Sequence, residues 1–447
     1  MILNTREHKR EYLKSWEFHF ILLITSNFNT MKRLFFYFIL ILFAAKTFGQ
    51  ETDQWRIDSI IIEKNWRTRD KIILQEMQFN KGDIVDEDCI GRSISQIWNI
   101  GNFAHVDYSL DSLSPEGYLL NLRAKDAFTL VPYITLSGNK DDKNFSIGFS
   151  DDNFLGRNIN LRINGNIGTY KSTYNLSAGI PRQLLYKNMT LNFSVSCGSG
   201  NSFRYENNKQ VSAVAYKTKQ FSGSIGNPWH TDYEYTFSPN FSFNLFQHKT
   251  DTSLVNTEVP FVKDYTVNYL ALSLGESIGL INKIRHQRDG YLVAGGYGIG
   301  IGLNKSSPVY HSFGFGASYY NTFNRIVELS ASFSTAYTTS TIPSLIHYMN
   351  SGDVRGIING QESGQGNYNA RLTGSFTYLY YNWFALEHSV YTHMGMAHDH
   401  YFEMYARKPR ISFGTEFKLW IPMVPWLAAS IHFTYLKGNN NWLHLDI

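Results

Sequence analysis

The side chain with the clearest capacity for specific polar chemistry is Arg355, within the segment Ser351–Ile357. Gly356 follows it and lets the backbone turn tightly and approach a wall closely. The Arg355 guanidinium is a permanent cation that needs an acceptor. These residues alone leave two interpretations open: a hairpin loop with a solvated arginine, or a loop held through that arginine. The surrounding elements must decide between them.

Three other patterns resemble sites of chemistry but lack the required context. Gly275–Gly279 has the Gly-x-Ser-x-Gly spacing of a nucleophile elbow, which needs a strand before it and a helix after it. Gly300–Ser306 carries a Lys-Ser pair after glycines, without the glycine directly before the lysine that a phosphate loop has. A set that could bind a metal is more simply an exposed polar loop: His393, His398, Asp399 and His400. We therefore predict no catalytic residues, no metal site, no cofactor and no enzymatic activity.

Composition indicates which class of protein must position Arg355. Of 447 residues, 43% are hydrophobic, 16% aromatic and only 17% charged. After the first fifty residues no apolar run reaches the length of about 18 that a spanning helix needs. This profile is typical of an outer-membrane β-barrel. The net charge of +4 is too small and scattered to indicate nucleic-acid binding, and Cys89 and Cys197 are predicted to be free thiols.

The first fifty residues carry an export signal. Residues 1–30 are interpreted as an upstream extension from a misplaced start codon. Residues 31–49 have a basic start, an apolar run over Leu34–Ala44 and a small residue, Gly49, at a plausible cleavage point. That run has the length of a signal-peptide core. The sequence therefore predicts export into a cell envelope.

Residues 51–125 predict a small α+β domain in the order β-α-α-β-β. A strand is expected over Trp55–Ile62, where alternation passes into an apolar run. Thr68 is expected to cap a first helix, and Asp86 opens a second helix with acids in its first turn. Two further strands are expected over Ala104–Asp111 and Tyr118–Ala124. A generic α+β adaptor is one interpretation of this order.

The other interpretation comes from a resemblance. The domain is similar to a POTRA domain, the periplasmic module of the BamA/TamA/TpsB superfamily of outer-membrane proteins. The residues that carry the similarity are Ile60–Ile62, Thr68, Gly82-Asp83, Ile97–Val106 and Leu110. Such a module offers an exposed strand edge, which can bind extended peptides by adding them to its sheet.

From Phe128 to Ile447, alternation with a period of two predicts a transmembrane antiparallel β-barrel. In Ile159–Ile167 and Tyr233–Phe243, apolar residues alternate with small and polar ones. One apolar face and one polar face, repeated many times, indicate lipid outside and water or a plug inside. At roughly 20 residues per strand and connection, the remaining length gives about 16 strands. Trp442–Ile447 is expected to be a closing strand.

Two motifs in the predicted barrel resemble motifs of the same superfamily. Asn153, Phe154, Leu155 and Gly156 are similar to its first-hairpin turn. Val354, Arg355 and Gly356 resemble its VRG(F/Y) motif, with Ile357 in the aromatic position. The resemblance implies a long loop folded back into the lumen, with Arg355 as a latch on a wall carboxylate. By alternation the inward-facing acids are Glu416, which we favour, and Glu387.

The resemblance implies a non-enzymatic protein of the bacterial outer membrane, with its N-terminal domain in the periplasm. Its expected role is outer-membrane protein assembly and insertion, or polypeptide translocation. The expected partners are unfolded outer-membrane or secreted polypeptides, outer-membrane lipid, and periplasmic chaperones or accessory proteins, with no nucleic acid. The alternative is a passive pore or a dedicated export channel for one secreted partner.

Overall fold

The computed structural model describes residues 53–63, 65–115, 117–138, 143–169, 171–181, 189–206, 209–227, 229–231, 235–250, 266–284, 286–342, 345–349, 353–355, 357, 362–381, 383–421 and 423–437. The predicted extension (1–30), the predicted signal (31–49) and the predicted closing strand Trp442–Ile447 lie outside these residues. No helix in the described part of the chain is both long and apolar enough to span a membrane.

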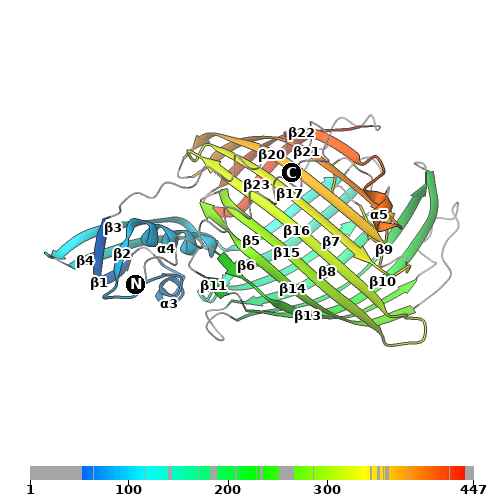
Figure 1. Ribbon diagram of the computed structural model, residues 1–447, viewed down its shortest axis with the longest axis horizontal. Coiled ribbons are helices and arrows are strands. Elements are labelled where there is room, and N and C mark those ends of the chain that lie inside the picture. Colours follow the sequence, from blue (N-terminus) through cyan, green and yellow to red (C-terminus); the bar gives the residue numbers. More distant parts are fainter. Residues whose placement is uncertain are drawn as a thin grey trace, which may run out of the picture. The chain divides into compact units, whose positions relative to one another are not determined.

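The elements up to Asp126 form a small α+β unit with its own sheet (Figure 1). Its strands have the order β2-β1-β4-β3, in which β1 and β4 are parallel and the other pairs antiparallel. The elements are β1 (Gln54–Glu63), α3 (Asp70–Leu74), β2 (Ile84–Asp86), α4 (Glu87–Asn99), β3 (Phe103–Ser114) and β4 (Gly117–Asp126). The predicted order holds except for β2, which the sequence pattern missed because it has only three residues.

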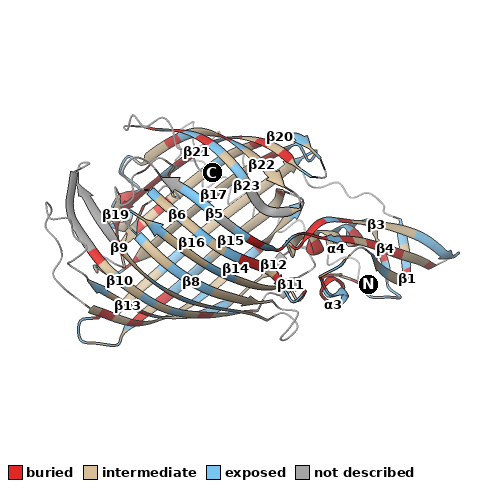
Figure 2. Ribbon diagram, turned by 180° about the vertical axis from the view of Figure 1, so that it is seen from behind, coloured by how far each residue is buried: buried red, intermediate tan, exposed pale blue. Residues whose placement is uncertain are grey.

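Helix α4 covers the sheet of this unit through its apolar face. Asp86 caps the helix by accepting a hydrogen bond from the Cys89 N–H at 2.7 Å. Ile90 and Ile97, which lie two turns apart, are fully buried against the sheet. In Figure 2 buried positions accordingly recur along α4 and the strands beneath it. Burial of this stripe stabilises the unit, since each such side chain contributes about 1.5–3 kcal/mol.

The predicted helix cap at Thr68 is wrong. The residue that precedes α3 in capping position is Arg69, and its side chain makes no capping hydrogen bond. The Thr68 hydroxyl instead donates to the carboxylate of Asp126, the last residue of β4. A buried carboxylate is the stronger acceptor, and it draws the hydroxyl away from the helix end.

The remaining strands, apart from β18 and β19, form the predicted closed barrel, and the strand pairs whose register is described are antiparallel. In the described part of the chain the barrel has fifteen long strands and the short hairpin β11–β12, which agrees with the predicted number of about 16. Their order is β5 through β10, the short β11 and β12, β13 through β17, then β20 through β23, which lies beside β5. The first group is β5 (Leu130–Gly138), β6 (Lys143–Phe154), β7 (Ile159–Gly168), β8 (Lys171–Ile180), β9 (Thr190–Glu206), β10 (Lys209–Gly226), β11 (Trp229–Thr231), β12 (Tyr235–Phe237) and β13 (Asn240–Thr250). The second is β14 (Thr266–Ile284), β15 (Gln287–Gly302), β16 (Tyr310–Phe323), β17 (Val327–Thr338), β20 (Gly366–Tyr380), β21 (Ala385–His398), β22 (Arg410–Ile421) and β23 (Val424–Leu436).

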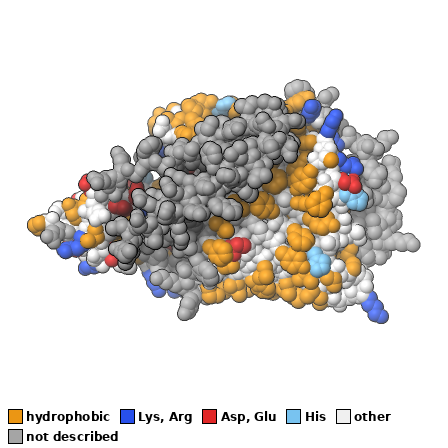
Figure 3. Space-filling model, in the orientation of Figure 1, with side chains coloured by type: hydrophobic (Ala, Val, Ile, Leu, Met, Phe, Trp, Pro, Cys, Tyr) orange, Lys and Arg blue, Asp and Glu red, His pale blue; other side chains and the backbone are white. Residues whose placement is uncertain are grey.

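The alternation in the sequence corresponds to the two faces of the barrel wall. Ile134 on β5, Ile147 on β6 and Ile163 on β7 are more than half exposed, and they point outward. Figure 3 shows hydrophobic side chains gathered over the outer surface of the strands. A closed ladder leaves no strand edge, so each backbone polar group in the wall can pair within the barrel.

The turn Asn153–Gly156 does not lie in the first hairpin of the barrel. It consists of the last two residues of β6 and the two residues after them, and it leads into β7; β6 and β7 are the second and third barrel strands. The first hairpin of the barrel is the one between β5 and β6, which the sequence pattern did not show as two strands. Leu155, Gly156 and Asn158 all have positive φ, so the turn is tight and left-handed.

Candidate functional site

The loop that carries Arg355 connects β17 to β20 and folds against the inside of the barrel wall. It contains a two-residue ladder between β18 (His347–Tyr348) and β19 (Ser363–Gly364). Val354 and Ile357 are buried in a cluster with Met349, Ala397 of β21 and Leu436 of β23. The apolar residues beside Arg355 therefore anchor the loop to β21 and β23, two of the last three described barrel strands. Gly356 lies outside the described residues.

Arg355 meets a carboxylate and an aromatic ring on that wall. Its Nη2 lies 3.2 Å from Oε2 of Glu416 on β22. Its guanidinium carbon is 4.6 Å from the centre of the Tyr391 ring on β21, in cation–π geometry. The arginine side chain is 26% exposed and the glutamate side chain 8%. Of the two acids selected from alternation, the structure thus brings Glu416 to Arg355.

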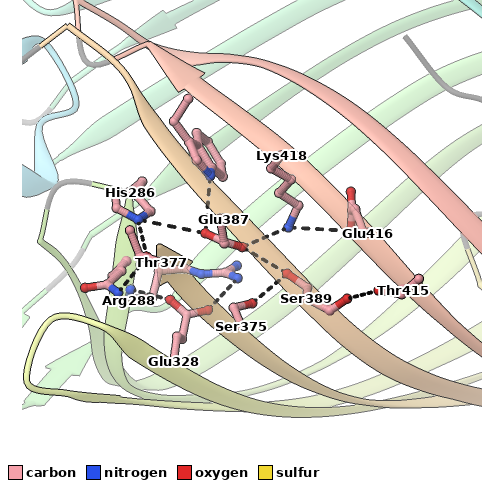
Figure 4. Close-up of polar contacts among 12 residues, drawn as sticks. His286, Arg288, Glu328, Ser375, Thr377, Glu387, Ser389, Thr415, Glu416 and Lys418 are labelled. Carbon is pink, nitrogen blue, oxygen red and sulfur yellow. Dashed lines mark hydrogen bonds and ion pairs between the residues drawn. The ribbon is translucent and has the colours of Figure 1, made fainter. Parts of the chain in front are cut away.

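Glu387 belongs to the same charged wall but contacts other groups. The Lys418 Nζ lies 3.4 Å from Glu387 and 3.5 Å from Glu416, so it bridges the two carboxylates (Figure 4). Glu387 also accepts hydrogen bonds from the Trp420 indole at 3.2 Å and the Ser389 hydroxyl at 3.0 Å. Lys418 thereby links the two acids into one network around the anchored loop.

A second ion pair joins β15 and β17, which lie on either side of β16. Arg288 of β15 contacts Glu328 of β17 through its side chain at 3.0 Å and its backbone N–H at 2.6 Å. His286 directly precedes β15. Its Nε2 forms a hydrogen bond with the Thr377 hydroxyl at 2.9 Å and lies 3.9 Å from Oε2 of Glu387. Sequence reasoning missed these residues and Lys418. The available signal was charge, because His286, Arg288, Glu328 and Lys418 are ionisable residues inside or beside barrel strands.

The turn residues Asn153–Gly156 lie at the small domain rather than at the Arg355 loop. The Asn153 side chain is fully buried and donates to the Thr68 hydroxyl at 2.8 Å. The Gly156 carbonyl accepts the Arg69 N–H at 3.0 Å. Phe154 and Leu155 are exposed. The two predicted motifs thus occupy separate places in the fold.

The patterns discounted in the sequence occupy barrel strands and their ends. Gly275–Gly279 lies within β14, and Gly300 lies within β15, where neither strand leads into a helix. His393 is buried on β21, so the expectation that it belongs to an exposed loop is wrong. Within the described ranges, no group of three or more His, Cys, Asp or Glu side chains could hold a metal ion. The site's evident chemistry is electrostatic: it can hold a loop against a wall.

Fold and site define a class: an outer-membrane β-barrel whose lumen holds an inward-folded loop. A family model described as the Omp85 superfamily domain matches residues 153–422. Because that range exceeds half of the chain, the protein belongs to the Omp85 superfamily, and it is a protein of the outer membrane. The family predicted from the two motifs and the small domain is thereby confirmed.

Individual relatives are distant. A protein of Treponema pallidum named "Putative outer membrane protein assembly factor" is 21% identical over 211 residues, which are 41% of this chain and 25% of that protein. The match thus spans about a quarter of the length of that curated relative.

Solved barrels share the fold. BamA from Haemophilus ducreyi lacking POTRA domains 1–3 aligns with 16% identity and a TM-score of 0.50, covering 89% of this chain and 84% of that one. CdiB from Escherichia coli aligns with 10% identity and a TM-score of 0.60, covering 88% and 75%. CdiB from Acinetobacter baumannii aligns with 13% identity and a TM-score of 0.53, covering 88% of this chain and 74% of that one. At these identities the likeness concerns the fold alone.

Proposed function

We propose that this protein inserts polypeptides into the outer membrane or passes them across it, without enzymatic chemistry. The carrying observation is the loop anchored between Glu416 and the strands that close the barrel. Its apolar cluster includes Leu436 of β23, the strand beside β5. A change in loop position therefore acts directly on the place where first and last strands meet, called here the seam.

The small domain is the proposed receiving module, of POTRA type and located in the periplasm. Its sheet ends at β3, which among the described strands pairs with β4 alone, so its other edge is open to the extent that the structure describes the chain. An open edge can take up an extended segment of an unfolded polypeptide by strand addition. Burial acts to raise the pKa of Asp107 on β3, but hydrogen bonds from His105 and Arg123 hold the pKa below its ordinary value. The edge therefore keeps an anionic group at neutral pH.

The proposed clients are unfolded outer-membrane or secreted polypeptides, which agrees with the assembly role in the name of the Treponema relative. A client segment received on β3 would pair next with a strand exposed at an opened seam. Surrounding lipid, periplasmic chaperones and accessory proteins are the further partners that such a route requires.

One observation favours the second candidate, a conducting pore or export channel. A cavity of about 470 Å³ lies along the inner wall and is lined by uncharged residues of β7 through β16. Its lining includes Ser194, Ser222 and Ser242, whose hydroxyls form hydrogen bonds across neighbouring strands. A polar, uncharged wall suits passage of solutes or of an extended chain through a lumen.

A disulfide across the seam tests the two candidates against each other. Cysteine pairs are placed in a short series between Ile134–Leu136 on β5 and Ala429–Ile431 on β23, at the same distance along each strand from the Phe128–Met423 hydrogen bond, in a background with Cys89 and Cys197 replaced by serine. The matched control is a disulfide between Ser146 and Asn166, which are paired on β6 and β7 away from the seam. Client insertion into liposomes, secretion and ion conductance in planar bilayers are measured with and without reductant.

If the proposal holds, the seam disulfide abolishes client insertion reversibly and leaves conductance in place, whereas the control disulfide changes neither. Insertion that proceeds normally through a locked seam, together with selective conductance, would show that the protein is a pore.

A further inference from the structure

A buried polar cluster joins the small domain to the barrel, and its centre is Asp126. This carboxylate is 1% exposed and lies at the end of β4, four residues before β5. It accepts the backbone N–H groups of Trp66 and Arg67, each at 2.7 Å, and that of Thr68 at 3.2 Å. The Thr68 hydroxyl donates to it as well. Three converging N–H groups form a fixed anion cradle, so the loop of residues 66–68 is held to the domain junction.

Arg67 extends from the same loop to the barrel. Its Nη2 lies 2.6 Å from Asp151 at the end of β6, and its Nη1 donates to the Thr129 hydroxyl at 2.8 Å. Asp151 is almost fully buried and also accepts from Thr129 at 3.0 Å. A buried carboxylate held by an arginine fork is a strong, directional contact.

The turn after β6 completes the cluster. Asn153 donates to Thr68 at 2.8 Å, and Gly156 accepts from Arg69 at 3.0 Å. Gly156 has φ +68°, and a Cβ at this position would clash with the carbonyl oxygen of Arg67. Only glycine therefore permits both the turn and the close approach of the loop.

The junction held in this way lies at the seam. The Phe128 N–H donates to the carbonyl of Met423 at 2.9 Å, and Met423 directly precedes β23. A separate contact holds α4 to β14. The Asn99 side chain donates a hydrogen bond to the Asn282 side chain at 3.0 Å and accepts one from the Lys283 N–H at 2.7 Å. The small domain is thus tied to the barrel at two places, one of which adjoins the first and last strands.

We propose that the cluster of Arg67, Thr68, Asp126, Asp151 and Asn153 is a positioning site that keeps the small domain beside the seam. The inference rests on the proposed function, because a client bound at β3 reaches the seam only while the domain stays in place. These residues contact no client; they act by fixing the orientation of the module that does.

The test measures domain position without a client. Spin labels are attached to cysteines at Asp88 on α4 and Tyr381 after β20, both exposed, in a background lacking Cys89 and Cys197. The variant is Arg67→Met, and Arg67→Lys keeps the charge but loses the fork. The matched control is Arg56→Met, which removes an exposed pair with Asp58 on the same domain. A difference in detergent-gel mobility between heated and unheated samples of each variant confirms that its barrel is folded.

Removing one partner of such a buried pair should lower the ratio of docked to undocked domain about a hundredfold. We expect one narrow label distance in the parent protein and in Arg56→Met, a broad distribution in Arg67→Met, and an intermediate one in Arg67→Lys. Client insertion should fall in the same order. An unchanged distance distribution in Arg67→Met overturns the positioning site, whatever the parent protein does with clients. Normal insertion by a variant with a broad distribution also overturns it, while failure of the parent protein to insert any client counts against the proposed function itself.

Discussion

Replacing Glu416 by glutamine removes the charge that Arg355 meets on β22 and leaves the shape of the wall unchanged. In the native protein the pair is 3.2 Å long, with the arginine 26% and the glutamate 8% exposed. In the part of the chain that the structure describes, the buried Arg355 Nη1 has no hydrogen-bond partner. The arginine would therefore keep its contact with Tyr391 and, in place of the ion pair, only a neutral hydrogen bond to the amide oxygen at position 416.

The size of the effect follows from this partial burial. Breaking a fully buried ion pair costs about 3–5 kcal/mol, and an exposed pair contributes about 0–1 kcal/mol. The intermediate exposure of this pair gives about 2 kcal/mol. The ratio of docked to undocked loop should then fall about thirtyfold. Glu387→Gln is the matched control, because it removes a neighbouring acid but leaves the Arg355–Glu416 contact intact.

The assay is protease cleavage of the loop between β17 and β20 in protein reconstituted into liposomes. When the loop closes faster than it is cut, the cleavage rate follows the undocked population. Glu416→Gln should be cleaved about thirtyfold faster than the parent protein, and Glu387→Gln less than about threefold faster. Conductance fluctuations in planar bilayers should become more frequent in the same variant. Equal cleavage rates for Glu416→Gln and the parent protein would refute the latch.

Two further outcomes are expected. Gly395→Ala should displace the loop and raise its cleavage rate. The added Cβ would lie 2.6 Å from Met349 and 3.0 Å from Val354 of the loop, and the Tyr368 carbonyl oxygen of β20, at 2.8 Å, prevents it from moving away from them. Gly314→Ala meets nothing within 4 Å and should behave as the parent, so equal cleavage rates for both variants would contradict this packing. Burial raises the pKa of the Cys89 thiol above its ordinary range, although Arg92 acts against it. Less thiolate then exists at a given pH, so in a Cys197→Ser background maleimide labelling should reach half of its maximal rate at higher pH in the folded protein than in urea, and a midpoint at or below that of the unfolded chain would count against this burial.

Much of the fold could be predicted because its signals are local. Which face of a strand meets lipid depends on every second residue of that strand, so alternation predicted the barrel, and the remaining chain length predicted its approximate strand number. Alternation also selected Glu416 as an inward-facing acid, and the structure places it at Arg355. The role of that pair as a latch remains a prediction.

The errors and omissions share a physical origin. Thr68 was expected to cap a helix because the residues around it suit a cap, but its hydroxyl serves Asp126, 58 residues away. Strand β2 escaped notice because three residues show too little periodicity. The charge of Lys418 was visible in the sequence, but its bridging role was not, because that role depends on Glu387, which lies on the neighbouring strand β21.

The sequence by itself determined the class of the protein: an exported chain with a small α+β domain, a lipid-facing barrel and a loop that carries Arg355. Only the tertiary structure decided which groups meet. Arg67 and Asp151 are 84 residues apart, and Arg355 and Glu416 are 61 apart. Such contacts depend on strand register and on the docking of one domain to another, which no local pattern encodes. The sequence predicts both the turn at Asn153 and the loop at Arg355 as motifs of the barrel. Only the structure assigns the turn to the domain junction and the loop to the lumen.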